Sequence, residues 1–558
     1  MRWVLPEVSP HAEGLARELG LAPFVAGILC GRGLHEAEAA RAFLDPRLAS
    51  LSDPFLLPDM EAAVVRVLAA IDRADRIVLY GDYDVDGVTS AALLTRVLRA
   101  YGAQPAQFLP QRVEEGYGLS ADGVSRCLAT HAPQLLIAVD CGTSSCAEIA
   151  DLCGRGVDVV VLDHHECTAA LPTCVALVNP KRAAGFHYLC SVGLVFKLAH
   201  ALLKRRPIAG FDLRAHLDLV ALGTVADLVP LVEENRTLVK RGLVQLGTSR
   251  FVGVRALIEA AALRPPFTCV DVGFGLGPRL NAAGRLGTAQ DALELLLTDD
   301  PSRARTLAVS LDQQNRERRA VEDAVFAEAE AQLAGWFDAE RDAAIVVGAA
   351  GWHPGVVGIV ASRLQRRYHR PTVVIGFDEN GVGKGSGRSI AGLSLVAALG
   401  ECGHLLDKFG GHEMAAGLSL AHARFVEVRD AFRACARARL SDEQLRPRLH
   451  VDAEVALDAV DFALLEHYAA LAPFGMSNPE PTLFARGVTL GGEPRMLKEK
   501  HLSLMLRQGR RDHRAIYFNA ASETLPRLPW DVAFTVERNE YGGCVTPQMR
   551  VRAIRHAE

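Results

Sequence analysis

Short apolar runs recur between residues 57 and 240 and give the first indication of the fold. Four of them, at 76–80, 135–139, 157–162 and 174–178, are rich in Val, Ile and Leu, and stretches with helical spacing separate them. Strands that are apolar on both faces and alternate with helices are typical of a parallel sheet covered by helices on each side. We therefore predict an α/β domain over residues 57–240.

The pattern changes beyond residue 240. Residues 241–340 have a mainly helical pattern, and 303–337 carry an intermittent apolar stripe with no Pro and a single Gly, which predicts one long helix. Residues 341–445 return to alternating strands and helices, opening with apolar runs at 342–347 and 372–375. The pattern thus predicts a second α/β domain, which the long helix joins to the first.

The two ends of the chain differ from both α/β domains. Residues 446–558 alternate apolar and polar positions in short runs such as 502–506 and 531–536, which predicts a small OB-type β-barrel. Residues 1–56 are rich in Ala, Leu and Glu at helical spacing, which indicates an N-terminal helical extension. The expected organisation therefore has five segments, at 1–56, 57–240, 241–340, 341–445 and 446–558.

Composition narrows the class of protein. A hydrophobic fraction of 49% with 23% charged residues is normal for a soluble globular chain. The longest apolar runs are strand-sized, and the N-terminus lacks a secretory signal, so we expect a cytoplasmic protein with no membrane contact. The twelve cysteines form no C-x-x-C pair, which favours reduced thiols. A net charge of −5 neither indicates a nucleic-acid binder nor excludes a local basic groove.

Three aspartates at alternate positions follow the first predicted strand. Asp82, Asp84 and Asp86 lie between that strand and a helix predicted to start near Val88. The carboxyl ends of parallel strands are where open α/β sheets bind their ligands, and clustered carboxylates require a compensating cation or protons. A calcium-binding EF-hand loop would need Glu at position 93, which is Leu. An ordinary Asp-Gly turn is the remaining structural alternative.

Further acidic and His residues follow the other strands. Asp140 ends the second strand, Asp163, His164 and His165 end the third, and Asp227 follows a predicted helix. Each alone could be a turn or capping residue, but such residues at several matching strand ends indicate one shared site. This number of oxygen and nitrogen ligands exceeds the needs of one octahedral ion. We therefore predict two Mn²⁺ or Mg²⁺ ions that share a carboxylate and promote phosphoryl displacement.

Two of these motifs carry a family resemblance. Gly81-Asp-Tyr-Asp-Val-Asp-Gly87 and Asp163-His-His165 resemble the signatures of the DHH phosphoesterases, in particular the bacterial single-strand-specific exonucleases of that family. The resemblance covers nearly the whole chain, through segments at 273–286, 351–358, 385–389, 409–414 and 473–479. It implies a DHH catalytic domain, a helical connector, a DHHA1 substrate-binding domain and a nucleic-acid-binding OB barrel.

The resemblance also implies roles for the acidic and His residues. Asp82, Asp84 and Asp140 would bind one metal ion, and Asp86, Asp140, His164 and Asp227 would bind the other, with Asp140 bridging them. The division of Asp82, Asp84 and Asp86 between the two ions stays open. His165 would face the scissile phosphate, and Asp163 would orient its neighbours.

A second set of residues is implied for substrate binding. Ser386 and Arg388 would bind a terminal 5′-phosphate together with Arg112 from the catalytic domain. Other residues would line the path of the strand or contact its phosphates, namely Arg279, Asn281, Arg285, His353 and His412. In the barrel, Tyr517 and Phe518 are candidates either for base stacking or for core packing. Ser191 and Leu280 depart from the family pattern, and both are expected to lie away from the chemistry.

The resulting hypothesis is a processive 5′-to-3′ exonuclease that releases mononucleotides from single-stranded DNA. The resemblance implies a preference for 5′-phosphorylated ends, a role in DNA repair and recombination, a monomeric state, and partners such as a helicase or single-strand binding protein. One alternative is a phosphodiesterase for short oligonucleotides or cyclic dinucleotides, which the additional domains disfavour. Another is an inactive DNA-binding scaffold, which predicts eroded metal ligands, whereas every ligand is present here.

Overall fold

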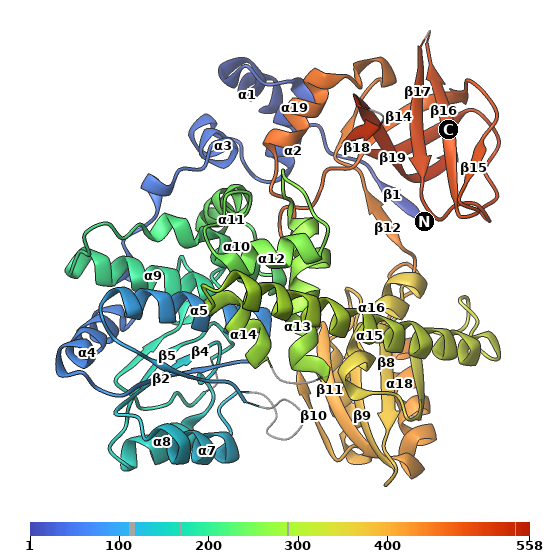
Figure 1. Ribbon diagram of the computed structural model, residues 1–558. Helices are drawn as coiled ribbons and strands as arrows, with labels where there is room; N and C mark the ends of the chain where they lie inside the picture. The colour runs from blue at the N-terminus through green and yellow to red at the C-terminus, as the bar shows by residue number, and fades with distance from the viewer. Residues whose placement is uncertain (111–117, 168, 287–288, 510, 542, 558) are drawn as a thin grey trace. The chain divides into compact units, whose positions relative to one another are not determined.

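The computed structural model divides into two compact units (Figure 1). It describes residues 1–110, 118–167, 169–286, 289–509, 511–541 and 543–557. One unit comprises residues 3–277, 293–304 and 449–558, and the other comprises 1–2, 278–292 and 305–448. Among the described residues, no helix combines the length and hydropathy needed to cross a bilayer.

A parallel sheet forms the centre of the first α/β domain, as predicted, but it has five strands, because the short strand Ala106–Phe108 joins the four that the sequence predicted. Its strand order is β3-β2-β4-β5-β6, with bounds Ala106–Phe108, Ile77–Gly81, Leu135–Val139, Asp158–Leu162 and Ala176–Val178. The interior strands β2, β4 and β5 are almost wholly buried because helices cover both faces. The predicted strand at 174–178 is shorter than expected, since its pairing with β5 begins only at Ala176.

The helices of this domain form two layers (Figure 1). One layer contains α4 (Met60–Arg73), α5 (Val85–Ala100), α9 (Ser191–Arg205) and α10 (Leu217–Ala226), and the other contains α7 (Ala121–His131) and α8 (Cys146–Gly154). Helix α5 begins at Val85 rather than near Val88, because the Asp84 side chain caps it by accepting a hydrogen bond from the Gly87 N–H. The first aspartate motif therefore runs directly into a helix.

Helices occupy residues 241–340, where the pattern is mainly helical, although the first of them begins at Glu233, within the segment 57–240. They are α11 (Glu233–Leu246), α12 (Val252–Ala260), a π-helical segment η5 (Asp271–Leu276), α13 (Gly277–Leu286), α14 (Gln290–Leu297) and α15 (Pro301–Ala334). Helix α15 is 34 residues long and matches the long helix predicted over 303–337. It ends before Gly335, where helix propensity falls.

The second α/β domain contains a mixed sheet. The strand order is β10-β11-β9-β8-β7, with bounds Lys408–Gly411, Ala415–Ala421, Val382–Arg388, Thr372–Phe377 and Ile345–Ala350. Only β7 and β8 pair in parallel, and the other pairs are antiparallel. The helices that accompany this sheet are α16 (Pro354–Tyr368), α17 (Leu395–Glu401) and α18 (Phe425–Arg439).

The C-terminal strands form the predicted barrel. Its seven strands follow the order β13-β14-β18-β19-β17-β16-β15, and a further β14–β16 pairing closes the sheet on itself. Their bounds are Ala453–Glu454, Leu483–Leu490, Trp530–Tyr541, Cys544–His556, Arg511–Tyr517, His501–Gln508 and Arg495–Leu497, with helix α19 (Phe462–Ala470) between β13 and β14. Trp530 and Phe534 are fully buried in the barrel core. The predicted fold class is thus confirmed.

The N-terminal helices share that barrel core. Helices α1 (Ala12–Leu19), α2 (Pro23–Gly31) and α3 (Ala37–Leu44) bury residues such as Val25 and Leu29 in one cluster with Leu483 and Trp530. The short strand β1 (Arg2–Val4) pairs with β12 (Arg448–His450). The sequence predicted helices here but not their packing partner, which lies more than 400 residues away.

Candidate functional site

The β2–α5 turn positions the first three aspartates. Asp82 and Asp86 are buried, whereas Asp84 is half-buried and serves as the N-cap of α5. Gly87 permits this tight turn, because a Cβ there would lie 2.5 Å from the backbone oxygen of Asp82. Gly223 of α10 makes similar room, since its Cβ would lie 3.0 Å from an Asp86 oxygen. Glycines at these two positions let the carboxylates pack against backbone.

Strands β4 and β5 contribute the next ligands at the same edge of the sheet. Asp140 directly follows β4 with a left-handed backbone (φ 64°), which is uncommon for a non-glycine residue. Asp163, His164 and His165 follow β5, and Asp227 is the C-cap of α10. The structure therefore brings together all the acidic and His residues that the sequence singled out in this domain.

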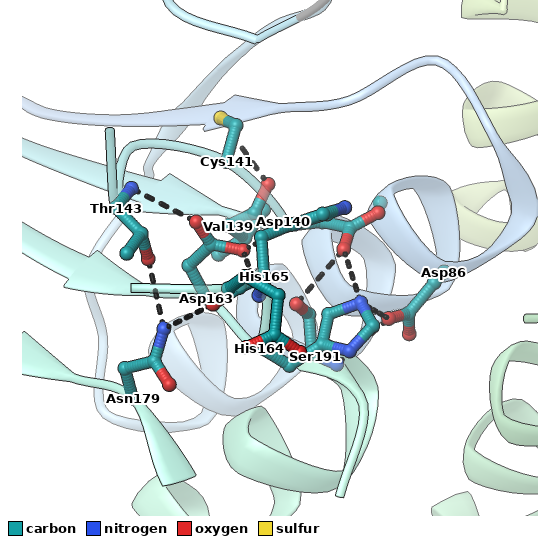
Figure 2. A network of polar contacts seen from close by, with 12 residues as sticks. Asp86, Val139, Asp140, Cys141, Thr143, Asp163, His164, His165, Asn179 and Ser191 are labelled. Atoms are coloured by element: carbon teal, nitrogen blue, oxygen red, sulfur yellow. Dashed lines mark hydrogen bonds and ion pairs between the residues drawn. The ribbon is translucent and has the colours of Figure 1, made fainter. Parts of the chain in front are cut away.

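His164 lies at the centre of the cluster (Figure 2). Its Nε2 is 3.4 Å from Asp140 Oδ1, 3.4 Å from Asp227 Oδ2 and 3.9 Å from Asp86 Oδ2. Among the described residues there are three sets of side chains whose ligand atoms lie within 4.8 Å of one another inside each set: Asp82, Asp84 and Asp140; Asp86, His164 and Asp227; and Asp140, His164 and His165. Asp140 and His164 each belong to two of these sets.

This donor set fits divalent metal ions. His164 Nε2 and Asp227 Oδ2 are buried and make no hydrogen bond within the described part of the chain. Buried polar atoms without partners are costly, and a cation between them would satisfy both. Carboxylate oxygens with a single imidazole suit Mg²⁺ and Mn²⁺ rather than a thiolate-preferring metal.

Burial and mutual repulsion control the electrostatics of the cluster. Burial, reinforced by the charge of Asp84, raises the pKa of Asp86 to about 7. Burial and the charge of Asp86 raise the pKa of Asp227 to about 9, and the pKa of Asp140 is also raised well above its ordinary value. Burial, with a contribution from His165, lowers the pKa of His164 to about 3. The imidazole of His164 is therefore neutral near pH 7 and can bind a metal ion.

A chain of hydrogen bonds orients His165 (Figure 2). Its Nδ1 lies 2.7 Å from Asp163 Oδ1, and Asp163 Oδ2 accepts a hydrogen bond from the Thr143 N–H. Asn179 Nδ2 donates to both Thr143 Oγ1 and the His165 carbonyl. Burial alone would lower the pKa of His165, but the Asp163 carboxylate outweighs it and raises that pKa. For Asp163, burial opposes ionisation, but these hydrogen bonds lower its pKa.

Thr143 and Asn179 were not predicted from the sequence. A signal for Asn179 was nevertheless present, because it directly follows β6, just as Asp140 and Asp163 directly follow β4 and β5. Applying the strand-end rule to the fourth strand would have identified it.

The expectation that Ser191 lies away from the chemistry is wrong. Its hydroxyl donates a hydrogen bond to Asp140 Oδ1 at 2.9 Å, and its backbone N–H donates to Asp86 Oδ2 at 2.7 Å. Ser191 is the first residue of α9, so folding brings a helix start to two carboxylates that lie 51 and 105 positions away. No local pattern in the sequence signals such a contact.

Strand β9 carries Ser386 and Arg388 in the second unit. Gly383, Gly385 and Gly387 face apolar side chains of neighbouring elements, so the intervening residues project from the opposite face. On that face Arg388 Nη1 donates to Ser386 Oγ at 2.9 Å. Both side chains approach Gly358 of α16, where a Cβ would lie 3.0 Å from Ser386 Oγ. Burial lowers the pKa of Arg388, and among the described residues no carboxylate pairs with it.

Other predicted substrate residues have different surroundings. Arg279 forms an ion pair with Asp312 at 2.8 Å, and Asp312 also pairs with Arg316. His353 caps α16 through Nδ1, which accepts a hydrogen bond from the Gly355 N–H. His412 is exposed between β10 and β11, and Asn281 is half-buried on α13.

Two predicted arginines fall outside what the structure describes. Arg112 lies in the segment 111–117, which is outside the described residues, and the same holds for the side chain of Arg285 on α13. In the barrel, Tyr517 packs against the core and donates to Glu523 Oε2, whereas Phe518 is 39% exposed with the Arg550 guanidinium 5.0 Å from its ring centre.

Comparisons with known proteins agree with this architecture. Residues 76–224 match the model of the DHH family N-terminal domain, 342–441 match the DHHA1 domain, and 451–553 match the RecJ OB domain. The single-stranded-DNA-specific exonuclease RecJ of Dickeya dadantii (strain 3937) is 40% identical over 487 residues, covering 83% of this chain and 84% of that protein. The enzyme of the same name from Bacillus subtilis (strain 168) is 35% identical over 99% of this chain and 70% of its own length.

A solved structure shows the same fold. The crystal structure of RecJ in complex with Mn²⁺ from Thermus thermophilus superposes with a TM-score of 0.86 at 31% sequence identity. The match covers 100% of this chain and 80% of that one.

Proposed function

Because this chain belongs to the RecJ family of single-stranded-DNA-specific exonucleases, we propose that it degrades single-stranded DNA from the 5′ end to mononucleotides with two divalent metal ions. The observation that carries the proposal is the cluster of Asp and His ligand atoms in which Asp140 and His164 each belong to two sets. Shared ligands of this kind are the expected protein contribution to a two-metal phosphodiesterase.

The residues divide between two metal positions in this proposal. Asp82, Asp84 and Asp140 would bind one ion, and Asp86, Asp140, His164 and Asp227 the other. When bound, the two ions activate water and stabilise the charge that develops on the phosphate oxygens. Mn²⁺ or Mg²⁺ would serve, as in the Mn²⁺ and Mg²⁺ complexes of the Thermus thermophilus enzyme.

His165 would act on the substrate rather than on a metal ion. Its Nδ1 lies 2.7 Å from Asp163 Oδ1, and Nε2 is the nitrogen that we propose contacts the scissile phosphate. The Asp163 carboxylate favours the protonated imidazole, so a hydrogen bond donated to an anionic phosphate is the role its surroundings support.

Recognition of the 5′ end would depend on strand β9. Arg388 is half-buried without a carboxylate partner among the described residues, so an anion would compensate its charge, and Ser386 would supply a second donor. Arg112 would join them. Arg279, Asn281, Arg285, His353 and His412 would contact the strand, and the barrel would bind incoming DNA.

The remaining properties follow from the family. We propose that the enzyme acts as a cytoplasmic monomer in DNA repair and recombination, on ends supplied by a helicase and in the presence of a single-strand binding protein.

One assay tests polarity and metal dependence together. Single-stranded DNA labelled at either end is incubated with Mn²⁺, Mg²⁺ or EDTA, and the products are resolved over time. The 5′ label should appear at once as mononucleotide, whereas the 3′ label should pass through progressively shorter strands. Immediate release of mononucleotide from the 3′ label, or turnover in EDTA, would overturn the proposal.

A further inference from the structure

Ser191 bridges two of the candidate metal ligands. Its hydroxyl donates to Asp140 Oδ1 at 2.9 Å, and its N–H donates to Asp86 Oδ2 at 2.7 Å (Figure 2). The N–H of Val192 donates a second backbone hydrogen bond to Asp86, to Oδ1 at 2.8 Å. One residue therefore connects a carboxylate at the end of β4 with a carboxylate in the first turn of α5.

The Asp140 oxygen that receives this hydroxyl also faces His164. His164 Nε2 lies 3.4 Å from the same Oδ1, so Ser191 and His164 converge on one atom (Figure 2). In the metal-free protein Asp140 is surrounded by the carboxyl groups of Asp82, Asp84, Asp86 and Asp227, whose negative charges repel its own. Repulsion would favour rotation of its carboxylate away from the cluster, and the hydroxyl is a donor that opposes this rotation.

The position of Ser191 makes it a rigid donor. Ser191 is fully buried, and its backbone is fixed at the start of the 15-residue helix α9, much of which lies in the core. Its own N–H is already committed to Asp86, so the hydroxyl can shift little relative to Asp140. Residues held in this way on regular elements are the ones that preorganise metal ligands.

We propose that Ser191 is a positioning residue that holds Asp140 in its metal-binding orientation. This inference rests on the proposed metal site. Loss of an outer partner of a metal ligand typically costs about 10- to 100-fold in affinity. We expect Ser191→Ala to weaken Mn²⁺ binding about tenfold, at the lower end of that range, because both backbone hydrogen bonds to Asp86 remain in the variant.

The same unit supplies a matched control. Ser249 is also buried, and its hydroxyl donates to the buried carboxylate of Asp218 at 2.6 Å, outside the metal cluster. Ser249→Ala therefore removes the same kind of hydrogen bond from a carboxylate that belongs to none of the three ligand sets, together with the bond that Ser249 Oγ accepts from the Phe251 N–H. Both variants should lower the melting temperature, but only Ser191→Ala should change metal affinity.

The test measures Mn²⁺ binding without turnover. Wild type, Ser191→Ala and Ser249→Ala are stripped with chelator and titrated with Mn²⁺, and free Mn²⁺ is counted by electron paramagnetic resonance. Ser191→Ala should bind about tenfold more weakly and Ser249→Ala within about twofold of wild type. In exonuclease assays Ser191→Ala should need correspondingly more Mn²⁺ for half-saturation, with kcat at saturating Mn²⁺ near wild type.

Several outcomes would overturn the inference. These are Ser191→Ala binding like wild type, equal weakening in both variants, or a fall in kcat with unchanged Mn²⁺ binding. If Ser191→Ala does not fold, Ser191→Gly removes the same hydroxyl and should show the same loss. Failure of the proposed function would look different, since the wild type itself would then neither bind Mn²⁺ nor cleave DNA.

Discussion

The acidic cluster and strand β9 differ in the sign and in the number of the charged residues that they hold. The cluster gathers five aspartates from the ends of β2 and β4, the start of α5 and the end of α10, so like charges face one another. Strand β9 instead holds one half-buried guanidinium beside a serine hydroxyl, with apolar neighbours on its glycine face. Each region thus gathers groups of one sign, several carboxyl groups in the first and, in the second, a guanidinium that has no carboxylate partner among the described residues.

The difference reflects the two kinds of sheet. In a parallel sheet the carboxyl ends of all strands meet at one edge, so residues distant in sequence converge there. In the antiparallel pairing of β8, β9 and β11 the residues of interest lie within a strand, and alternation alone separates the buried glycines from Ser386 and Arg388. Side chains that converge at one sheet edge can supply the several ligands that a cation needs. Side chains that alternate along β9 instead place Ser386 and Arg388 on one face, where they can bind a single anion.

Removing Asp140 should have the largest effect. Asp140→Asn should lower exonuclease activity by about 10³-fold or more, because one neutral amide would replace a carboxylate shared by two ligand sets. The control is Asp218→Asn, which alters another buried aspartate outside the cluster and should retain activity. Steady-state rates on end-labelled DNA measure both. Comparable loss in the two variants would show that burial, not metal binding, explains the effect.

Competition between protons and Mn²⁺ should have an effect on metal affinity that is nearly as large. Asp86 and Asp227, with pKa values of about 7 and 9 in the metal-free protein, hold protons that a metal ion must displace. Apparent Mn²⁺ affinity should therefore rise between pH 6 and 9, about tenfold per pH unit for each proton displaced. Calorimetry in buffers of different ionisation enthalpy would detect the released protons. A pH-independent affinity would contradict this prediction.

Asp86 and Asp227 should also make the stability of the metal-free protein depend on pH. Their pKa values are raised in the folded state, so their contribution to stability is fully present below the unfolded value of 3.8 and is lost as the pH rises toward 9. Thermal unfolding in EDTA should show a falling midpoint from pH 5 to 9, and Mn²⁺ should restore more stability at pH 9 than at pH 6. A midpoint that stays level over this range would count against raised pKa values.

Arg388 provides the corresponding test of strand β9. Arg388→Gln should reduce the preference for 5′-phosphorylated over 5′-hydroxyl ends by about 10- to 100-fold, since a hydrogen bond to a charged group contributes about 1.5–3 kcal/mol. Competition between the two substrates in one reaction measures the ratio directly. Arg424→Ala, at an exposed position of the same unit, controls for loss of positive charge. An unchanged ratio in Arg388→Gln would assign the 5′ end to other residues.

Arg279 should show the smallest effect and sharpens the contrast with Arg388. Because Arg279 already has an ion-pair partner in Asp312, we expect its contact with the strand to contribute little, and Arg279→Gln should change KM for single-stranded DNA by no more than about threefold. A larger increase would mean that Arg279 leaves Asp312 to bind the strand.

The sequence by itself determined the elements and most of the candidate metal ligands. Apolar runs of strand length alternating with helices predicted the parallel sheet, because burial on both faces leaves a direct signature in the residues of β2, β4 and β5. Polar residues that end such runs predicted where Asp140, Asp163 and His164 would meet. Long helix α15 and the barrel followed from periodicity in the same way.

Only the tertiary structure decided which atoms face one another. The start of α9 reaches Asp140 and Asp86, Asp312 pairs with Arg279, and α1 to α3 join the barrel core, yet none of these pairings has a local signature. Periodicity indicates whether a residue is buried, because residues two apart in a strand, and three or four apart in a helix, lie on the same face of the element. It does not report the partner, because the partner depends on how distant elements pack. Ser191 is the clearest case, an ordinary helix residue in the sequence that becomes a donor to two candidate metal ligands in the folded protein.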